Sequence, residues 1–143
     1  MTLFVLDASV AAKWFLSPND EELTVEALAL LRKFSQREAS FIIPDLFWAE
    51  IASAFRKAIR LSRFDEASAQ NAFRFLESCH LPAYSTALLL HNAFEIALAH
   101  NRSVYDSLYV ALAVQSHAPL ITADERLANA LASRFPVKWL GSL

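Results

Sequence analysis

The sequence contains near its start an apolar stretch that ends on a carboxylate, Thr2-Leu3-Phe4-Val5-Leu6-Asp7. It runs directly into a helical pattern over Ala8 to Leu16, with no loop between them. A short apolar run followed by a helix is typical of a buried strand in a parallel sheet, because parallel strands need crossover connections. We therefore expect residues 2–6 to form a strand, with Asp7 at its carboxyl end.

The same alternation of short apolar runs and helical patterns continues along the chain. Further strands are expected over 41–43, 119–122 and 137–139, with 81–84 as an extended link or strand. Helices are expected over 8–16, 21–37, 45–59, 65–79, 86–100, 104–116 and 124–134. This order predicts a parallel sheet of about four to five strands covered by helices on both faces. No repeat or linker interrupts it, so residues 1–143 are expected to form a single α/β domain.

The chain contains a single glycine, Gly141, where average usage of about 7% would give roughly ten. Phosphate loops of the Walker type and dinucleotide-binding fingerprints both need glycines, because the backbone must approach phosphate closely. The sequence excludes both kinds of site. Any phosphate chemistry must therefore use side chains or metal ions.

The bulk composition favours a globular protein of the cytoplasm. Hydrophobic residues make up 55% and charged residues 20% of the chain, and no apolar run reaches the ~18 residues of a membrane span. No basic segment precedes the first apolar stretch, so neither a signal peptide nor a membrane partner is expected. The lone Cys79 cannot form an internal disulfide, which fits a reducing compartment. The net charge of −2 argues against a broadly basic nucleic-acid binder but allows a local basic patch.

Four carboxylates stand in apolar surroundings without an obvious basic partner: Asp7, Glu50, Asp106 and Asp124. Asp7 and Asp124 follow predicted strands, and the carboxyl ends of parallel strands form the ligand crevice of open sheets. Glu50 and Asp106 lie about one turn into apolar helices. Burying an unpaired carboxylate costs several kcal/mol, and hard divalent cations with oxygen ligands relieve that cost. An all-carboxylate site is typical of metal-assisted phosphodiester cleavage.

Each carboxylate also has a structural explanation. Ser103 and Asp106 form a capping-box pattern, and Thr122 to Glu125 form a similar one in which Asp124 is an acid of the first turn that the helix dipole favours. Asp7 can cap the helix that follows it. Glu50 lies too deep in its helix to cap it, so its alternative is an exposed position. The hypothesis that the four carboxylates share one site is favoured. Without such a site, all four structural explanations would have to be true at the same time.

Four segments, in this order, resemble the PIN-domain nucleases, and their spacing is similar to that of the VapC-type toxins of bacterial toxin–antitoxin pairs. The segments are Val5-Leu6-Asp7-Ala8-Ser9, Pro44-Asp45-Leu46-Phe47-Trp48-Ala49-Glu50, Tyr105-Asp106-Ser107-Leu108-Tyr109-Val110-Ala111-Leu112-Ala113 and Leu120-Ile121-Thr122-Ala123-Asp124-Glu125-Arg126-Leu127. The resemblance covers nearly the whole chain. It implies a three-layer α/β/α PIN-like domain.

The resemblance also implies a catalytic site. The family's acidic quartet, which holds one or two Mg²⁺ or Mn²⁺ ions, matches Asp7, Glu50, Asp106 and Asp124. Asp7 and Asp106 would be the most direct ligands, with Glu50 and Asp124 completing the site directly or through water. Ser9 and Thr122 match polar positions that orient these carboxylates by hydrogen bonds.

Basic residues near the quartet are candidates for contacts with phosphate. Lys13 lies one and a half turns after Asp7, and Arg102 lies four residues before Asp106. A basic run closes the helix that carries Glu50: Arg56, Lys57, Arg60 and Arg63. This run could guide an RNA backbone, although a solvated helix face is the alternative.

The resemblance implies a Mg²⁺- or Mn²⁺-dependent endoribonuclease that cuts single-stranded RNA regions and is silenced by a cognate antitoxin protein. The apolar faces of residues 86–98 suggest a homodimer or antitoxin contact. One alternative is a PIN-domain nuclease of RNA maturation or quality control, and another is a PIN-like module that only binds partners. A phosphatase with Asp7 as nucleophile is a third, but it needs a second acid where this chain has Ser9.

Overall fold

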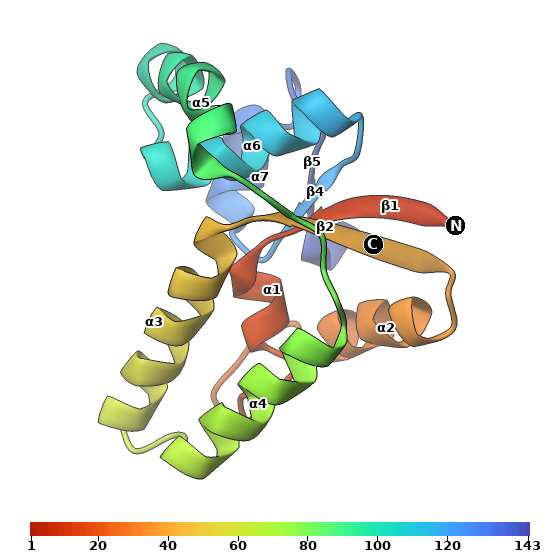
Figure 1. The fold of residues 1–143 in the computed structure, drawn as a ribbon, viewed down its shortest axis with the longest axis vertical. Helices are drawn as coiled ribbons and strands as arrows, with labels where there is room; N and C mark the ends of the chain where they lie inside the picture. The colour runs from red at the N-terminus through yellow and green to blue at the C-terminus, as the bar shows by residue number, and fades with distance from the viewer.

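The computed structural model describes residues 1–143 and contains one five-stranded sheet (Figure 1). Its strands are β1 (Thr2–Leu6), β2 (Ala39–Pro44), β3 (Ala83–Tyr84), β4 (Leu120–Thr122) and β5 (Val137–Trp139). They lie in the order β3-β2-β1-β4-β5, and every neighbouring pair is parallel. The predicted strands are confirmed, and the stretch over 81–84 contains the edge strand β3.

Seven α-helices connect the strands and cover the sheet. They are α1 (Ala8–Ala12), α2 (Thr24–Ser35), α3 (Leu46–Arg60), α4 (Glu66–Ser78), α5 (Thr86–His100), α6 (Val104–Ser116) and α7 (Glu125–Leu131), and a 3₁₀ turn over Leu140–Ser142 ends the chain. Helices α1 to α4 lie on one side of the sheet and α5 to α7 on the other (Figure 1). None of the helices combines the length and the hydrophobicity of a membrane-spanning segment.

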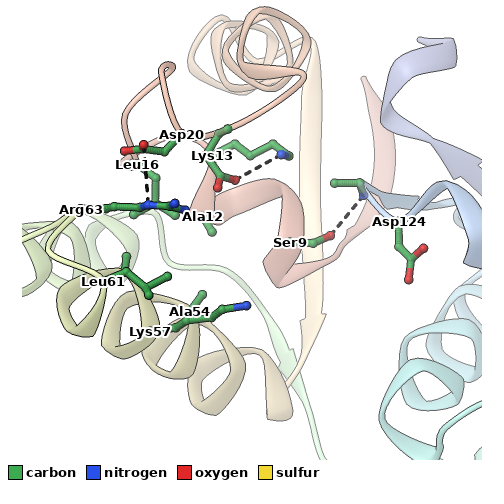
Figure 2. Close-up of a pocket in the computed structure, with 13 residues that line it drawn as sticks. Ser9, Ala12, Lys13, Leu16, Asp20, Ala54, Lys57, Leu61, Arg63 and Asp124 are labelled. Carbon is green, nitrogen blue, oxygen red and sulfur yellow. Dashed lines mark hydrogen bonds and ion pairs between the residues drawn. The ribbon is translucent and has the colours of Figure 1, made fainter.

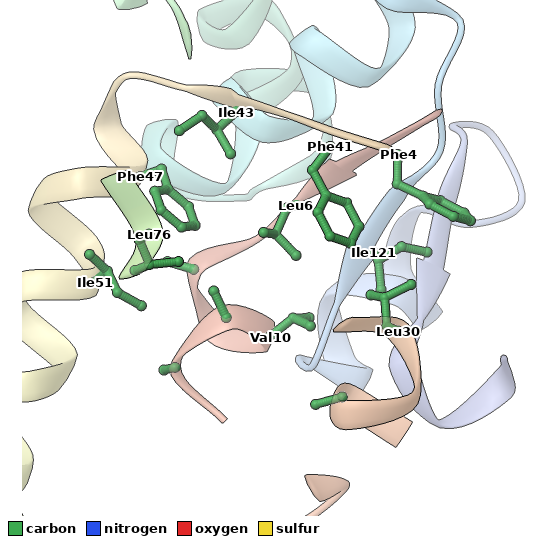
Figure 3. Close-up of a cluster of buried hydrophobic side chains, with 14 of the residues drawn as sticks. Phe4, Leu6, Val10, Leu30, Phe41, Ile43, Phe47, Ile51, Leu76 and Ile121 are labelled. Atoms are coloured by element: carbon green, nitrogen blue, oxygen red, sulfur yellow. The ribbon is translucent and has the colours of Figure 1, made fainter. Parts of the chain in front are cut away.

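The sheet buries both faces, as a central parallel sheet requires. Alternate residues of β1 point to opposite faces, so Phe4 and Leu6 pack into the core beneath α1 to α4 (Figure 3). Val5 packs into the second core, against α5 to α7. The central strand is therefore covered on both sides, and the predicted three-layer α/β/α architecture is confirmed.

Three helix boundaries differ from the prediction by three or more residues, and one of them is the end of the helix expected over 124–134, which lies at Leu131. The helix expected over 8–16 is α-helical only as far as Ala12. From there to Leu16 the chain forms turns in which most backbone amides bond to the carbonyl three residues earlier. The helix expected from residue 21 begins at Thr24, because Leu23 has a left-handed backbone with φ of 59°. The segment between them is therefore a loop over residues 17–23, which is called the α1–α2 loop below.

The chain ends most of its helices without glycine. Six non-glycine residues have φ between 50° and 61°: Leu23, Arg37, Ser62, His80, Asn101 and His117. Five of the six follow the carboxyl ends of helices α2 to α6. Glycine is the usual residue at such a position, because a Cβ atom is strained in the left-handed region. The near absence of glycine therefore costs stability at helix ends.

Candidate active site

The four carboxylates predicted to form a site come from four elements around the carboxyl edge of the sheet. Asp7 directly follows β1, and Asp124 caps α7 after β4, which pairs with β1. Glu50 lies in the second turn of α3, which follows β2, and Asp106 lies in the first turn of α6. Because β2, β1 and β4 are parallel neighbours, these segments meet at one edge of the sheet.

Asp7 is buried, with 8% of its surface exposed. Its Oδ1 accepts a hydrogen bond from the Ser9 amide at 3.2 Å, and its Oδ2 accepts one from the Thr122 hydroxyl at 2.8 Å. Burial nevertheless raises the pKa of Asp7 from 3.8 to about 6, and the negative charges of Glu50 and Asp106 contribute to the rise. The fold thus holds Asp7 in one orientation in a place that disfavours its charge.

Electrostatic interactions link the remaining carboxylates to Asp7. Glu50 and Asp106 are half-buried, and burial raises the pKa of each. The charge of Asp106 further raises the pKa of Glu50, and the charge of Asp124 further raises that of Asp106. Asp124 itself is exposed. The four groups therefore form one region of concentrated negative charge.

No cation neutralises this region by an ion pair. The two ion pairs of the chain join Lys13 to Glu21 at 3.2 Å and Arg63 to Asp20 at 3.8 Å. Arg102 lowers the pKa of Asp106 through its charge, but its Nε donates a hydrogen bond to the Asn101 carbonyl. The charge of the carboxylates is thus left for an external cation.

Ser9 and Thr122 connect the end of β1 to the turn between β4 and α7. Thr122 is fully buried, and its hydroxyl accepts a hydrogen bond from the Asp124 amide at 3.1 Å while donating to Asp7. The Ser9 hydroxyl accepts a hydrogen bond from the Ala123 amide at 3.1 Å. These bonds fix the two aspartates that follow neighbouring strands relative to one another.

Two of the carboxylates also cap helices, Asp7 as predicted and Asp124 as the N-cap of α7 rather than as an acid of its first turn, whereas Glu50 is half-buried and not at an exposed position. Asp7 caps α1 through the Ser9 amide, and Asp124 caps α7 by accepting from the Arg126 and Leu127 amides. In α6 the Ser103 hydroxyl accepts a hydrogen bond from the Asp106 amide, and its proximity to the Asp106 carboxylate lowers the pKa of that group. Capping and membership of the acidic region are thus compatible.

The donor set of this region suits a hard divalent cation. The donors are carboxylate oxygens without His or Cys, which is the set that Mg²⁺ and Mn²⁺ prefer. As the side chains stand, no group of three or more His, Cys, Asp or Glu is placed to hold a metal ion. The chemistry of the region fits such an ion, because Mg²⁺ is commonly held by one or two carboxylates together with waters.

Tyr109 is a part of this region that the sequence analysis missed. It lies one turn after Asp106 on α6 and is 1% exposed. The Glu50 carboxylate and the Tyr109 hydroxyl perturb each other's pKa, but the hydroxyl makes no regular hydrogen bond. The sequence signal was its spacing of three residues from Asp106, which places it on the same helix face.

A family model for the PIN domain matches residues 4–131. The chain belongs to the PIN-domain family. The match includes all four carboxylates, the second part of β1 and the strands β2 to β4, and it ends before β5.

Individual proteins are similar to this chain over most of their length. Ribonuclease VapC3 from Pyrobaculum aerophilum is 34% identical over 129 residues, covering 87% of this chain and 92% of that protein. The crystal structure of PAE2754 from the same organism has a TM-score of 0.70 at 21% identity, covering 99% of this chain and 85% of that one. VapBC2 from Rickettsia felis, solved with a DNA fragment from its promoter, has a TM-score of 0.63 at 15% identity and covers 96% and 98%. The two structures support the fold.

Proposed function

We propose that this PIN-domain chain is a divalent-metal-dependent endoribonuclease that cleaves single-stranded RNA and serves as the toxin of a toxin–antitoxin pair. The observation that carries the proposal is the region of four carboxylates at the sheet edge, with the buried Asp7 at its centre and no cationic partner. The similarity to a protein named Ribonuclease VapC3 supports the choice of RNA as substrate.

In the proposed site, Asp7 and Asp106 are the most direct ligands of Mg²⁺ or Mn²⁺, with Glu50 and Asp124 completing the site. When bound, such an ion supplies an activated water and stabilises charge on the leaving oxygen. Ser9 and Thr122 hold Asp7 in place through the hydrogen bonds described above. We further propose that Lys13 and Arg102 contact phosphates of the RNA.

Two observations weigh on the alternatives. The solved neighbour VapBC2 supports an antitoxin protein as partner in the toxin hypothesis. A covalent phosphatase gains no support, because position 9 carries a serine whose hydroxyl accepts from the Ala123 amide.

We also propose a homodimer through α5, whose outer face exposes Leu88, Phe94 and Leu98. A cytoplasmic location fits the single free Cys79.

The Asp7→Asn variant tests the proposed site. It keeps the size of the side chain but removes the charge, so we expect cleavage of single-stranded RNA to fall at least about 100-fold. The Glu95→Gln variant, which alters an exposed carboxylate on α5, should cleave as the wild type does. Cleavage is followed on gels with Mn²⁺, with Mg²⁺ and with EDTA, and calorimetry measures Mn²⁺ binding. Cleavage that survives EDTA, or an unimpaired Asp7→Asn variant, would contradict the proposal.

A further inference from the structure

A pocket of about 380 Å³ lies beside the carboxylate region, between α1, α3 and the α1–α2 loop (Figure 2). Ser9 and Asp124 line one end of the pocket, so it is continuous with the candidate active site. Arg63 and Asp20 line the other end. A volume of this order suits a unit the size of one nucleotide.

Three cations from two neighbouring elements reach this pocket. Lys13 follows α1 and is only 9% exposed, whereas Lys57 on α3 and Arg63 just after α3 are exposed. The wall between the cations is aliphatic, with Leu16 and Leu61 among its members. Cations with an aliphatic wall suit a nucleotide, whose phosphate binds the cations while its ribose and base contact the wall.

The α1–α2 loop already supplies anions to two of these cations. Glu21 pairs with Lys13 at 3.2 Å, and Asp20 pairs with Arg63 at 3.8 Å (Figure 2). The two carboxylate side chains remain 27% and 31% exposed, and Arg63 is 53% exposed. The Arg63–Asp20 pair is open to solvent and weak, whereas the Lys13 side chain is only 10% exposed and keeps an anion beside it, which a phosphate can supply as well as Glu21. A phosphate with access to the pocket can therefore replace the carboxylates at Lys13 and Arg63.

We propose that this pocket binds the nucleotide next to the scissile phosphate of single-stranded RNA, with phosphates on Lys13 and Arg63, and that Glu21 and Asp20 compete with the RNA for these cations. The inference rests on the proposed nuclease function and adds an RNA subsite with an acidic competitor built into the chain. The pocket is continuous with the carboxylate site, and this favours RNA as the ligand. The nucleotides on either side of a phosphodiester bound at the carboxylates must lie in the spaces next to that site, and the pocket is such a space.

Opposite effects of two substitutions test the proposal. Lys13→Met removes a phosphate contact, so it should weaken binding of a short fluorescein-labelled single-stranded RNA about tenfold and lower its salt dependence by roughly one ionic contact. Glu21→Gln frees Lys13, so it should tighten binding about threefold or more. Fluorescence anisotropy of the full chain in EDTA measures both affinities without cleavage.

Matched controls separate local contacts from net charge. Glu22→Gln makes the same charge change one residue away, at an exposed position that does not line the pocket. Lys33→Met makes the same change as Lys13→Met on the exposed side of α2. Each control should alter RNA affinity less than about twofold. Circular dichroism checks the fold of Lys13→Met, and the substitution Glu21→Gln, at a partly exposed side chain, gives a second result that does not depend on the Lys13 variant.

Three outcomes would overturn the subsite: Glu21→Gln matching Glu22→Gln, Lys13→Met binding RNA as tightly as the wild type, or Glu21→Gln improving binding of a polyglutamate peptide but not of RNA. The last would assign the pocket to an acidic protein segment. Metal-dependent cleavage is measured on the same preparations. Cleavage by Lys13→Met with an unchanged KM would reject the proposed subsite but not the proposed nuclease function. If the variants change RNA affinity as expected but the wild type does not cleave RNA, the nuclease function is rejected and the subsite is not.

Discussion

At the scale of single residues, Asp7 shows how a site can oppose the stability of its own fold. Its pKa is about 6 in the folded chain against 3.8 as the ordinary value, with burial as the main cause. The folded state therefore binds the proton more tightly than the unfolded state does. The resulting stabilisation is fully present below about pH 4 and is lost as the pH rises through about 6. Without metal, the protein should lose stability across this range.

The Asp7→Asn variant is predicted to be more stable than the metal-free wild type near neutral pH. Removing the buried charge of Asp7 should add about 3 kcal/mol to the free energy of unfolding, because that is the energy of a pKa shift of about two. Asparagine has one side-chain oxygen instead of two, so it should lose about 1 kcal/mol of hydrogen bonding. We expect a net gain of about 1 to 2 kcal/mol in the free energy of unfolding at about pH 7.5, vanishing near pH 4. Urea unfolding in EDTA measures it, with Glu95→Gln as control. Equal destabilisation by Asp7→Asn at both pH values would contradict the assignment.

At the scale of elements, the helix ends show what the shortage of glycine costs. His117 is exposed and left-handed, with φ of 51°, and the Ala118 amide closes the end of α6 by bonding to the Ala113 carbonyl. His117→Gly relieves the strain of a Cβ atom there but adds freedom to the unfolded chain. We expect a gain of about 0.5 to 1 kcal/mol, or about 2 to 4 °C in Tm.

His117→Ala is the control for this helix end. It removes the imidazole but keeps the Cβ atom, so it should bring no gain. Thermal unfolding followed by circular dichroism compares the two variants with the wild type. A stabilisation by alanine equal to that by glycine would show that the imidazole, rather than the left-handed backbone, is the unfavourable feature.

At the scale of the whole molecule, the architecture was predictable because it depends on local patterns. Buried strands such as β1 are continuous apolar runs, and the helices between them are long enough to read from the sequence. The approximate place of the four carboxylates followed from the same patterns, since strand ends meet at one edge. The lengths of α1 and of the α1–α2 loop were not predictable, because the left-handed Leu23 has no reliable signature.

The detailed surroundings of the site depend on distant pairings, which a single sequence does not display. The hydrogen bond from Thr122 to Asp7 joins residues 115 positions apart, and that from Ala123 to Ser9 joins residues 114 apart. Tyr109 sits within an almost wholly apolar helix, so nothing in the sequence around it indicates that its hydroxyl lies beside Glu50. Contacts of this kind are set by tertiary structure alone.

The outer face of α5 leads to a prediction for assembly. Leu88, Phe94 and Leu98 are 77%, 54% and 70% exposed, whereas α5 buries only Leu89 and Ala93 within the chain. A cluster of large apolar side chains on one exposed helix is typical of an interface. We expect a homodimer at micromolar concentration in light scattering, and the Leu88→Glu/Leu98→Glu variant should be monomeric because each glutamate would be desolvated in the interface.

Val25→Glu is the matched control for this interface, because Val25 is 78% exposed on α2, away from α5. It should leave the mass of the assembly unchanged. A wild type that is monomeric at micromolar concentration would contradict the homodimer, as would a dimer that survives both glutamates. If the wild type is monomeric, the exposed face of α5 is expected to bind a different protein. Co-purification of the Leu88→Glu/Leu98→Glu variant with the antitoxin tests whether the antitoxin binds this face. If it does, the two glutamates should abolish the complex.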